Sequence, residues 1–198
     1  MKRIVIAGGI GAGKSAATDY LATLGYPIID ADDVAHDVTR PGEPAFEALR
    51  DAFGDAVVAP DGTLDRAFVA EIVFHDESAL KRLNLITHGH IGREITSRIE
   101  ATTGAAVFIS LPLFRSEHRA TFRIDEAWAI VSEPEVALSR LVEHRGFLEQ
   151  DARARLAAQM SNEERASIVD VVVRNDGSLE DLHLAIDRQL ERSGLSHG

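Results

Sequence analysis

Residues 8–15, with the sequence GGIGAGKS, constrain this chain more than any other stretch, and they closely follow the apolar run IVI at 4–6. The spacing is G-x-x-x-x-G-K-S, the pattern of a phosphate-binding loop between a strand and a helix. Glycines let backbone N–H groups approach phosphate oxygens, and the amino-terminal end of the next helix attracts the same anion. The alternative is a plain glycine-rich turn, but chance matches in this context are rare.

Each part of the loop has an expected role. Lys14 reaches the outer phosphates as a point charge, and the Ser15 hydroxyl is placed to bind the Mg²⁺ that bridges them. The residues expected to hold the phosphates are Gly9, Gly11, Ala12, Gly13, Lys14, Ser15 and Ala16. The implied ligand is ATP or GTP with Mg²⁺.

The composition limits the number of domains and the kinds of partner. With 198 residues, 45% of them hydrophobic, the chain suits one α/β core with a helical appendage. The absence of cysteine excludes disulfides and zinc–thiolate sites and favours a reducing compartment, the cytoplasm. The net charge of −11 argues against a nucleic-acid partner, and we expect no membrane span. A monomer or weak homo-oligomer is expected.

Five short segments, the apolar runs at 4–6 and 105–109 and the mainly apolar stretches at 26–30, 125–131 and 169–173, predict the strands of a parallel sheet. Helical patterns separate them. The sequence therefore predicts a three-layer α/β/α fold of the P-loop NTPase type, with a five-stranded parallel sheet, as one domain over residues 1–198. We assign about 1–40, 104–133 and 168–192 to the core, about 41–103 to a helical insert and about 134–167 to a helical lid.

Residues 45–103 have helical periodicity almost throughout, with a predicted turn at Asp61-Gly62. This is more than a crossover between two strands needs, so we interpret it as an insert that covers a substrate. Within it, His88-Gly89-His90 predicts a helix break flanked by two imidazoles. Substrate contact or local capping is favoured there over metal binding, because no carboxylate stands at metal-ligand spacing.

Two carboxylates, Asp30 and Asp32, follow the second predicted strand. Ligands of open α/β sheets bind beyond the carboxyl ends of strands, so both residues fall on the edge that carries the phosphate loop. We expect this strand to neighbour the loop strand, which makes Asp32 the candidate base for an acceptor hydroxyl. The alternative is that Asp32 only caps the helix that follows it.

A basic segment follows residue 134 in this otherwise acidic chain. Its arginines are Arg140, Arg145, Arg153 and Arg155. Arginines on a mobile pair of helices commonly stabilise a departing phosphate. The alternative is a solvated helix face on which Glu143 and Glu149 pair with them.

From residue 4 to about 182, the sequence resembles the dephospho-coenzyme A kinase family. The phosphate loop is generic, but further short motifs occur in the family's order. They are IDAD at 29–32, PGEPA at 41–45, FG at 53–54, DGTLDR at 61–66, TH at 87–88, LPL at 111–113, RL at 140–141 with Arg145, Arg155 with QM at 159–160, and NDGS at 175–178. The resemblance implies transfer of the ATP γ-phosphate to the ribose 3′-hydroxyl of dephospho-coenzyme A.

The resemblance also implies roles for individual residues. Asp32 would be the base, while Lys14 and Arg140 would stabilise the transferring charge and Ser15 would hold Mg²⁺. Beyond the loop, the contacts to ATP would be Arg145 and Asn175, the latter beside the adenine. The contacts to the acceptor would be Asp32, His36, Arg66, His88 and Leu113.

The sequence departs from the family's usual residues at several positions. This chain has Ala7 where the family usually has threonine, His36 where it has arginine, and Gly89 where it has proline. It also has Ser110 in place of aspartate, Arg115-Ser116 in place of Phe-Glu, and Ala137 in place of glutamine. Ser110 matters most, because an aspartate at the end of the strand beside the loop usually supports magnesium. Two alternatives therefore stay open: a kinase of the same fold for another nucleoside-like acceptor, and a non-catalytic ATP-binding module.

Overall fold

The computed structural model describes residues 1–195, and tertiary contacts divide the chain into two compact units. The first, Met1–Asp30 with Thr102–Gly198, holds the sheet, and the second, Ala31–Ala101, is helical. The helix α2 (Ala31–Asp37) groups with the second unit, whereas the sequence analysis placed residues up to about 40 in the core. The single domain and the bounds of the insert and lid stay predictions.

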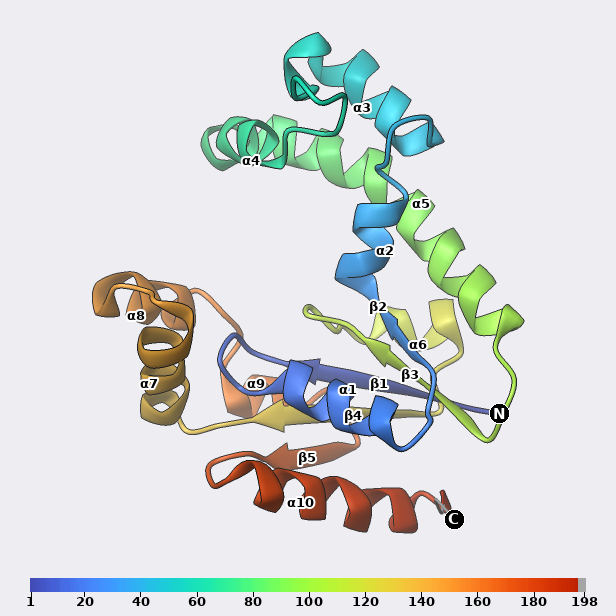
Figure 1. Cartoon of the computed structure of the whole chain (residues 1–198), viewed down its shortest axis with the longest axis vertical. Coiled ribbons are helices and arrows are strands. Elements are labelled where there is room, and N and C mark those ends of the chain that lie inside the picture. Colours follow the sequence, from blue (N-terminus) through green and yellow to red (C-terminus); the bar gives the residue numbers. More distant parts are fainter. Residues whose placement is uncertain (196–198) are drawn as a thin grey trace. The chain divides into compact units, whose positions relative to one another are not determined.

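The strands of the first unit form one five-stranded sheet in the order β2-β3-β1-β4-β5 (Figure 1). Their bounds are β1 (Lys2–Gly8), β2 (Ile28–Asp30), β3 (Ala106–Ser110), β4 (Glu126–Val131) and β5 (Val171–Arg174). Every pairing is parallel. The predicted parallel five-stranded sheet is therefore confirmed.

The expectation that β2 neighbours β1 is wrong, because β3 lies between them. All five residues of β3 are buried, so this strand suits a position with a neighbour on each side and both faces covered. β2 has only three residues, of which Ile29 alone is buried, and so short a strand suits the edge of a sheet.

Helices cover both faces of this sheet. α1 and α10 pack on one face, where Leu21 and Ile186 are buried in the same cluster as Ile6 and Trp128. α6 and α9 lie behind the sheet in the view of Figure 1. The helices of this unit are α1 (Lys14–Thr23), α6 (Glu117–Phe122), α7 (Pro134–Arg145), α8 (Glu149–Ala157), α9 (Asn162–Ala166) and α10 (Leu179–Arg192). The predicted α/β/α layering follows.

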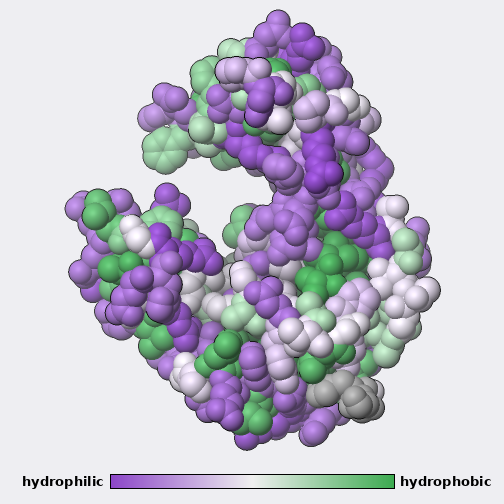
Figure 2. All heavy atoms as spheres, in the orientation of Figure 1, coloured by the Kyte–Doolittle hydropathy of each residue, from purple (hydrophilic) through white to green (hydrophobic). Residues whose placement is uncertain are grey.

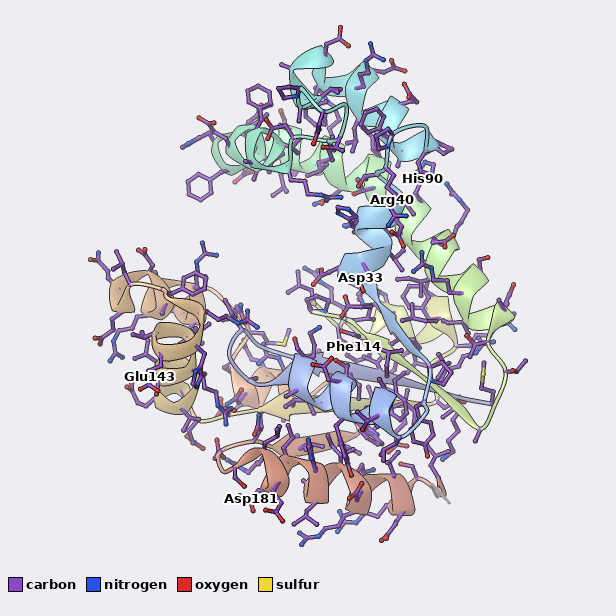
Figure 3. The ribbon with its side chains drawn as sticks, viewed as in Figure 1. Asp33, Arg40, His90, Phe114, Glu143 and Asp181 are labelled. Carbon is purple, nitrogen blue, oxygen red and sulfur yellow. The ribbon has the colours of Figure 1, made fainter. Side chains whose placement is uncertain are left out.

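Local sequence sets where α7 and α10 begin. Pro134 occupies the first turn of α7, where its missing N–H costs no hydrogen bond. Ser178 and Asp181 form a capping box at the start of α10, and Asp181 is labelled in Figure 3. Both helices follow the carboxyl ends of strands, so these caps fix loops that lie on the edge of the phosphate loop.

The second unit contains α2, α3 (Pro44–Phe53), the 3₁₀ helix η1 (Asp55–Val57), α4 (Arg66–His75) and α5 (Glu77–Ala101). The predicted break at His88-Gly89-His90 is wrong, because α5 continues through it; Figure 3 labels His90. Ile95 and Ile99 are buried along this helix. Their packing outweighs the roughly 1 kcal/mol that a glycine costs inside a helix.

Hydrophilic side chains cover most of the face shown in Figure 2, with smaller hydrophobic patches between them. Within residues 1–195, no helix combines the length and the apolar character that a bilayer crossing requires.

Candidate active site

The phosphate loop joins the carboxyl end of β1, at the centre of the sheet, to the start of α1. Gly11 and Gly13 have φ angles of 75° and 93°, left-handed conformations that glycine adopts without strain. Among residues 1–195, no protein acceptor takes a hydrogen bond from the N–H groups of Gly11, Gly13, Lys14 or Ser15. These donors, at the positive end of α1, are therefore available to an anion.

Neighbouring elements press closely on this loop. A Cβ atom at Gly13 would overlap the side-chain amide of Asn175, and one at Gly11 would lie 2.7 Å from the carbonyl oxygen of Ala137. Glycine is thus required at both positions for two reasons: the positive φ angle, and the lack of room for a Cβ atom. The first turn of α7 and the loop after β5 therefore pack against the phosphate loop and restrict the shape of this phosphate-binding cradle.

A hydrogen-bond network holds the loop to the ends of β4 and β5. Asn175 is buried, and its Nδ2 donates to the Ala12 carbonyl oxygen at 2.9 Å. Ser132 Oγ donates to the Asn175 carbonyl oxygen at 2.6 Å. Arg140 Nη1 donates to Ser132 Oγ and to the Asn175 carbonyl oxygen, each at 2.9 Å. In the described part of the chain, Arg140 donates to neutral oxygens alone, so its charge stays available to an anion.

Lys14 lies beside the carboxyl ends of β2 and β3. Its ammonium hydrogen-bonds Ser110 Oγ and lies 3.6 Å from Asp30 Oδ2. Ser110 Oγ donates to the same carboxylate oxygen at 2.6 Å, because Asp30 and Ser110 are register partners on adjacent strands. Although Ser110 stands where aspartate is expected, a carboxylate therefore still lies next to Lys14.

The described residues fit a magnesium ion that arrives with the nucleotide. Ser15 is exposed in the first turn of α1, with Ala16 after it. Residues 1–195 contain no cluster of three or more His, Asp or Glu side chains that could hold a metal ion by themselves. Mg²⁺ needs no such cluster, because it keeps several waters and takes few protein ligands beside substrate phosphates.

The four arginines after residue 134 separate into different environments. Arg140 joins the network at the loop, whereas Arg145 and Arg155 are exposed. Arg153 pairs with Glu149 at 2.9 Å on the surface, as the solvated-face alternative predicts. The structure thus brings one of these arginines to the phosphate loop, and a nucleotide contact by Arg145 stays a prediction.

Four predicted acceptor contacts belong to the helical unit: Asp32, His36, Arg66 and His88. Asp32 is exposed in the first turn of α2, and His36 is exposed near its end. Arg66 opens α4 and donates to Thr39 Oγ1 at 2.6 Å, which places it beside the residues that follow α2. His88 is exposed in α5. Their contacts with a substrate stay predictions.

One cavity borders the phosphate loop within the sheet unit, and a second reaches Ala7, the residue before the loop. The first, of about 950 Å³, is lined by Gly9, Ile10 and Ala12 together with residues of α7, α8 and α9. The second, of about 420 Å³, is lined by Ala7 and by residues 112–117, which include the predicted acceptor contact Leu113. The space beside the loop is therefore sufficient for a small-molecule ligand.

Gln159 and Arg165 lie beside the phosphate loop, and the sequence alone predicts no role for either residue. Gln159 Oε1 accepts a hydrogen bond of 3.0 Å from the N–H of Ile10, in the loop. Arg165, in α9, is 8% exposed and lines both cavities, and burial lowers the pKa of its guanidinium. A lone arginine in a short helical segment gives no motif, so only the packing of α9 reveals its position.

Comparisons with known proteins agree with this geometry. The family model described as dephospho-CoA kinase matches residues 3–181. The dephospho-CoA kinase of Corynebacterium glutamicum is 42% identical over 186 residues, which cover 92% of each chain. A solved structure from Thermus thermophilus is 30% identical with a TM-score of 0.81, covering 96% of this chain and 97% of that one. The dephospho-CoA kinase structure from Campylobacter jejuni is 25% identical with a TM-score of 0.66 and 96% coverage of each chain.

Proposed function

The chain belongs to the dephospho-CoA kinase family, and on that premise we propose that it phosphorylates the ribose 3′-hydroxyl of dephospho-coenzyme A with ATP. The products are coenzyme A and ADP. The observation that supports the proposal is the phosphate loop, in which the N–H groups of Gly11, Gly13, Lys14 and Ser15 have no protein acceptor among the described residues. Family membership supplies the acceptor, which the loop alone does not specify.

The proposed reaction forms one bond and breaks one. The acceptor's 3′-oxygen bonds to the γ-phosphorus, and the bond from that phosphorus to the oxygen shared with the β-phosphate breaks. Asp32 takes the hydroxyl proton. Lys14 and Arg140 bind the phosphate oxygens as negative charge moves toward ADP.

In this proposal Ser15 holds Mg²⁺ together with the nucleotide phosphates. The ion neutralises phosphate charge when it is bound. Asp30 and Ser110 orient the Lys14 ammonium, because both contact it at the ends of their strands. The Asn175 segment borders the adenine and Arg145 adds a nucleotide contact. The acceptor contacts His36, Arg66, His88 and Leu113.

We also propose a cytoplasmic protein that is a monomer or a weak homo-oligomer. A cysteine-free sequence and a reaction that consumes ATP support that compartment. Light scattering at several protein concentrations tests the assembly, because a weak oligomer dissociates on dilution.

ADP release by the purified chain with ATP, Mg²⁺ and dephospho-coenzyme A tests the proposed activity. We expect release to depend on the acceptor and the product to gain one phosphoryl group by mass spectrometry. Coenzyme A is the matched control, because its 3′-oxygen already carries phosphate. Release with other nucleosides but not with dephospho-coenzyme A would assign another acceptor. ATP binding without any release would indicate a non-catalytic module.

A further inference from the structure

Arg165 is a buried cation without a matching anion. It is 8% exposed, and within residues 1–195 no carboxylate lies within ion-pair distance of it. Its guanidinium makes one long hydrogen bond, 3.5 Å from Nη1 to Asn162 Oδ1. By contrast, Arg119 pairs with Asp170 at 2.9 Å. A buried charge without a partner is costly, so a structural role alone does not account for Arg165.

The guanidinium lies against the phosphate loop. A Cβ atom added at Gly9 would lie 3.3 Å from Arg165 Nη2 and 3.5 Å from Nη1. The same Cβ would lie 3.1 Å from Gln159 Oε1, the group that accepts the Ile10 N–H. Gln159 thus ties the segment before α9 to the loop. The absence of a side chain at Gly9 is what lets Arg165 approach.

Both cavities beside the loop share this arginine. Arg165 borders the cavity that contains Gly9 and Ile10 and also the cavity formed by residues 112–117 after β3. Arg140 is likewise held by neutral oxygens, and it lies near Gly13. The loop is therefore flanked by two arginines, one at each end, and neither makes an ion pair with a described carboxylate.

We propose that Arg165 is a phosphate-binding residue that takes an oxyanion in the cavity beside Gly9. The fork of the guanidinium matches two phosphate oxygens, and the low exposure strengthens the contact. This rests on the proposed function for the identity of the ligands. The oxyanion comes either from the terminal phosphate of the nucleotide or from a phosphate of the acceptor.

Calorimetry on the full chain tests the assignment with three probes in Mg²⁺ buffer: a non-hydrolysable ATP analogue, ADP and dephospho-coenzyme A. For Arg165→Met we expect affinity for at least one probe to fall about 10- to 100-fold, as for a lost hydrogen bond to a charged group. Loss for the ATP analogue but not for ADP identifies the terminal phosphate. Loss for dephospho-coenzyme A alone identifies the acceptor. Unchanged affinity for all three probes overturns the proposal.

Thermal melting of the ligand-free protein separates binding from structure. Because the charge is uncompensated, Arg165→Met should not lower the Tm. The control Arg119→Met loses the ion pair to Asp170 and should lower the Tm while leaving all three affinities unchanged. If Arg165→Met fails to fold, Arg165→Lys takes its place, and it must weaken at least one probe several-fold because lysine lacks the fork. Wild-type affinities in Arg165→Lys then overturn the proposal.

A wrong acceptor and a wrong role for Arg165 give different results in these titrations. If wild-type protein binds the ATP analogue but neither binds nor phosphorylates dephospho-coenzyme A, the proposed acceptor is wrong. The role of Arg165 can still be tested in that case. Weaker binding of the ATP analogue by Arg165→Met would support phosphate binding by Arg165, and unchanged binding would contradict it.

Discussion

The side-chain amide of Asn175 donates to the carbonyl oxygen of Ala12 at 2.9 Å, so the loop after the last strand fixes the phosphate loop. Asn175 also accepts two hydrogen bonds on its own carbonyl oxygen, from Ser132 and Arg140. One buried residue therefore sets the shape of the cradle and the place of a candidate catalytic arginine.

Replacing Asn175 with alanine should raise the KM for ATP about tenfold and lower stability by about 1–2 kcal/mol. The buried Ala12 carbonyl loses its 2.9 Å hydrogen bond and keeps only the longer contact, 3.3 Å, with Ser132 Oγ. Steady-state kinetics and urea unfolding measure the two effects. Gln189→Ala is the matched control: it removes another buried amide, bonded to Glu126, and should lower stability alone. An unchanged KM in Asn175→Ala would separate this contact from nucleotide binding.

Gly13→Ala should abolish nucleotide binding. It combines a φ of 93°, which costs alanine about 1–2 kcal/mol, with a clash against Asn175. Gly42→Ala is the control, because its φ is 89° but nothing lies within 4 Å of its added Cβ. Gly42→Ala should lose stability through backbone strain alone and should bind ATP with normal affinity in a calorimetric titration. Normal ATP binding in Gly13→Ala would mean that the loop adopts another shape with ligand.

Lys14→Ala should reduce kcat by a factor of about 10³ or more, because it removes the ammonium beside Asp30 and Ser110 that stabilises the transferring charge in the proposed reaction. ADP release at saturating substrates measures the loss. The exposed Lys81 in α5 offers Lys81→Ala as a control for the loss of one positive charge. Full activity in Lys14→Ala would remove the proposed mechanism.

Asp32→Asn should lower kcat by about 10²- to 10⁴-fold and leave the affinity for ATP nearly unchanged, since a base acts on the acceptor. The comparison needs both turnover and a direct ATP titration. A parallel fall in ATP affinity would instead assign Asp32 to magnesium binding or to structure. The neighbouring Asp33→Asn tests whether any carboxylate at the start of α2 matters.

Asp37 tests how the helical unit is held together. Arg98 donates a hydrogen bond of 2.7 Å to Asp37, which joins α2 to α5. This hydrogen bond is the largest cause that lowers the pKa of Asp37 below its ordinary value of 3.8. A lowered folded pKa gives stability that is present above the unfolded pKa and is lost as pH falls through the folded pKa. Arg40, labelled in Figure 3, also pairs with Asp37.

Asp37→Asn should therefore cost about 0.5–1 kcal/mol at neutral pH, a value reduced for solvent screening of this partly exposed pair. The difference from wild type should shrink below about pH 4 and vanish at still lower pH. Urea unfolding at several pH values measures it. Asp33→Asn is the control, because Asp33 makes no ion pair within the described residues. A pH-independent difference would assign the loss to helix geometry.

Much of the fold follows from local patterns. The apolar runs predict all five strands, and the run at 105–109 reads as buried on both faces, as β3 is. The order of the strands cannot be predicted from these patterns, because hydrophobic periodicity shows which face of a strand is buried but not which strand lies beside it. For this reason the prediction that β2 neighbours β1 is wrong. The break expected at Gly89 fails for a related reason: buried Ile95 and Ile99 lie far enough along α5 to stabilise the helix through the glycine.

The candidate site likewise has a part that can be predicted from the sequence and a part that cannot. The phosphate loop has a fixed spacing, so its residues can be named from sequence. Gln159 touches the loop 149 residues later in the chain, and Ser132 holds Asn175 across 43 residues. Such contacts have no local signal, because they exist only when the ends of the strands and α9 come together. Ser110 shows the same limit, since the carboxylate of Asp30 becomes its partner only through strand register.

The central position of β1 has a consequence for synthesis. Both of its partners, β3 and β4, lie about a hundred residues further along, up to Val131. A nascent chain emerging from the ribosome therefore exposes an unpaired apolar ribbon, including Ile4 and Ile6, until more than half of the polypeptide has been translated. Until those partners emerge, this ribbon is the part of the young chain with the most apolar backbone to shield from neighbouring polypeptides.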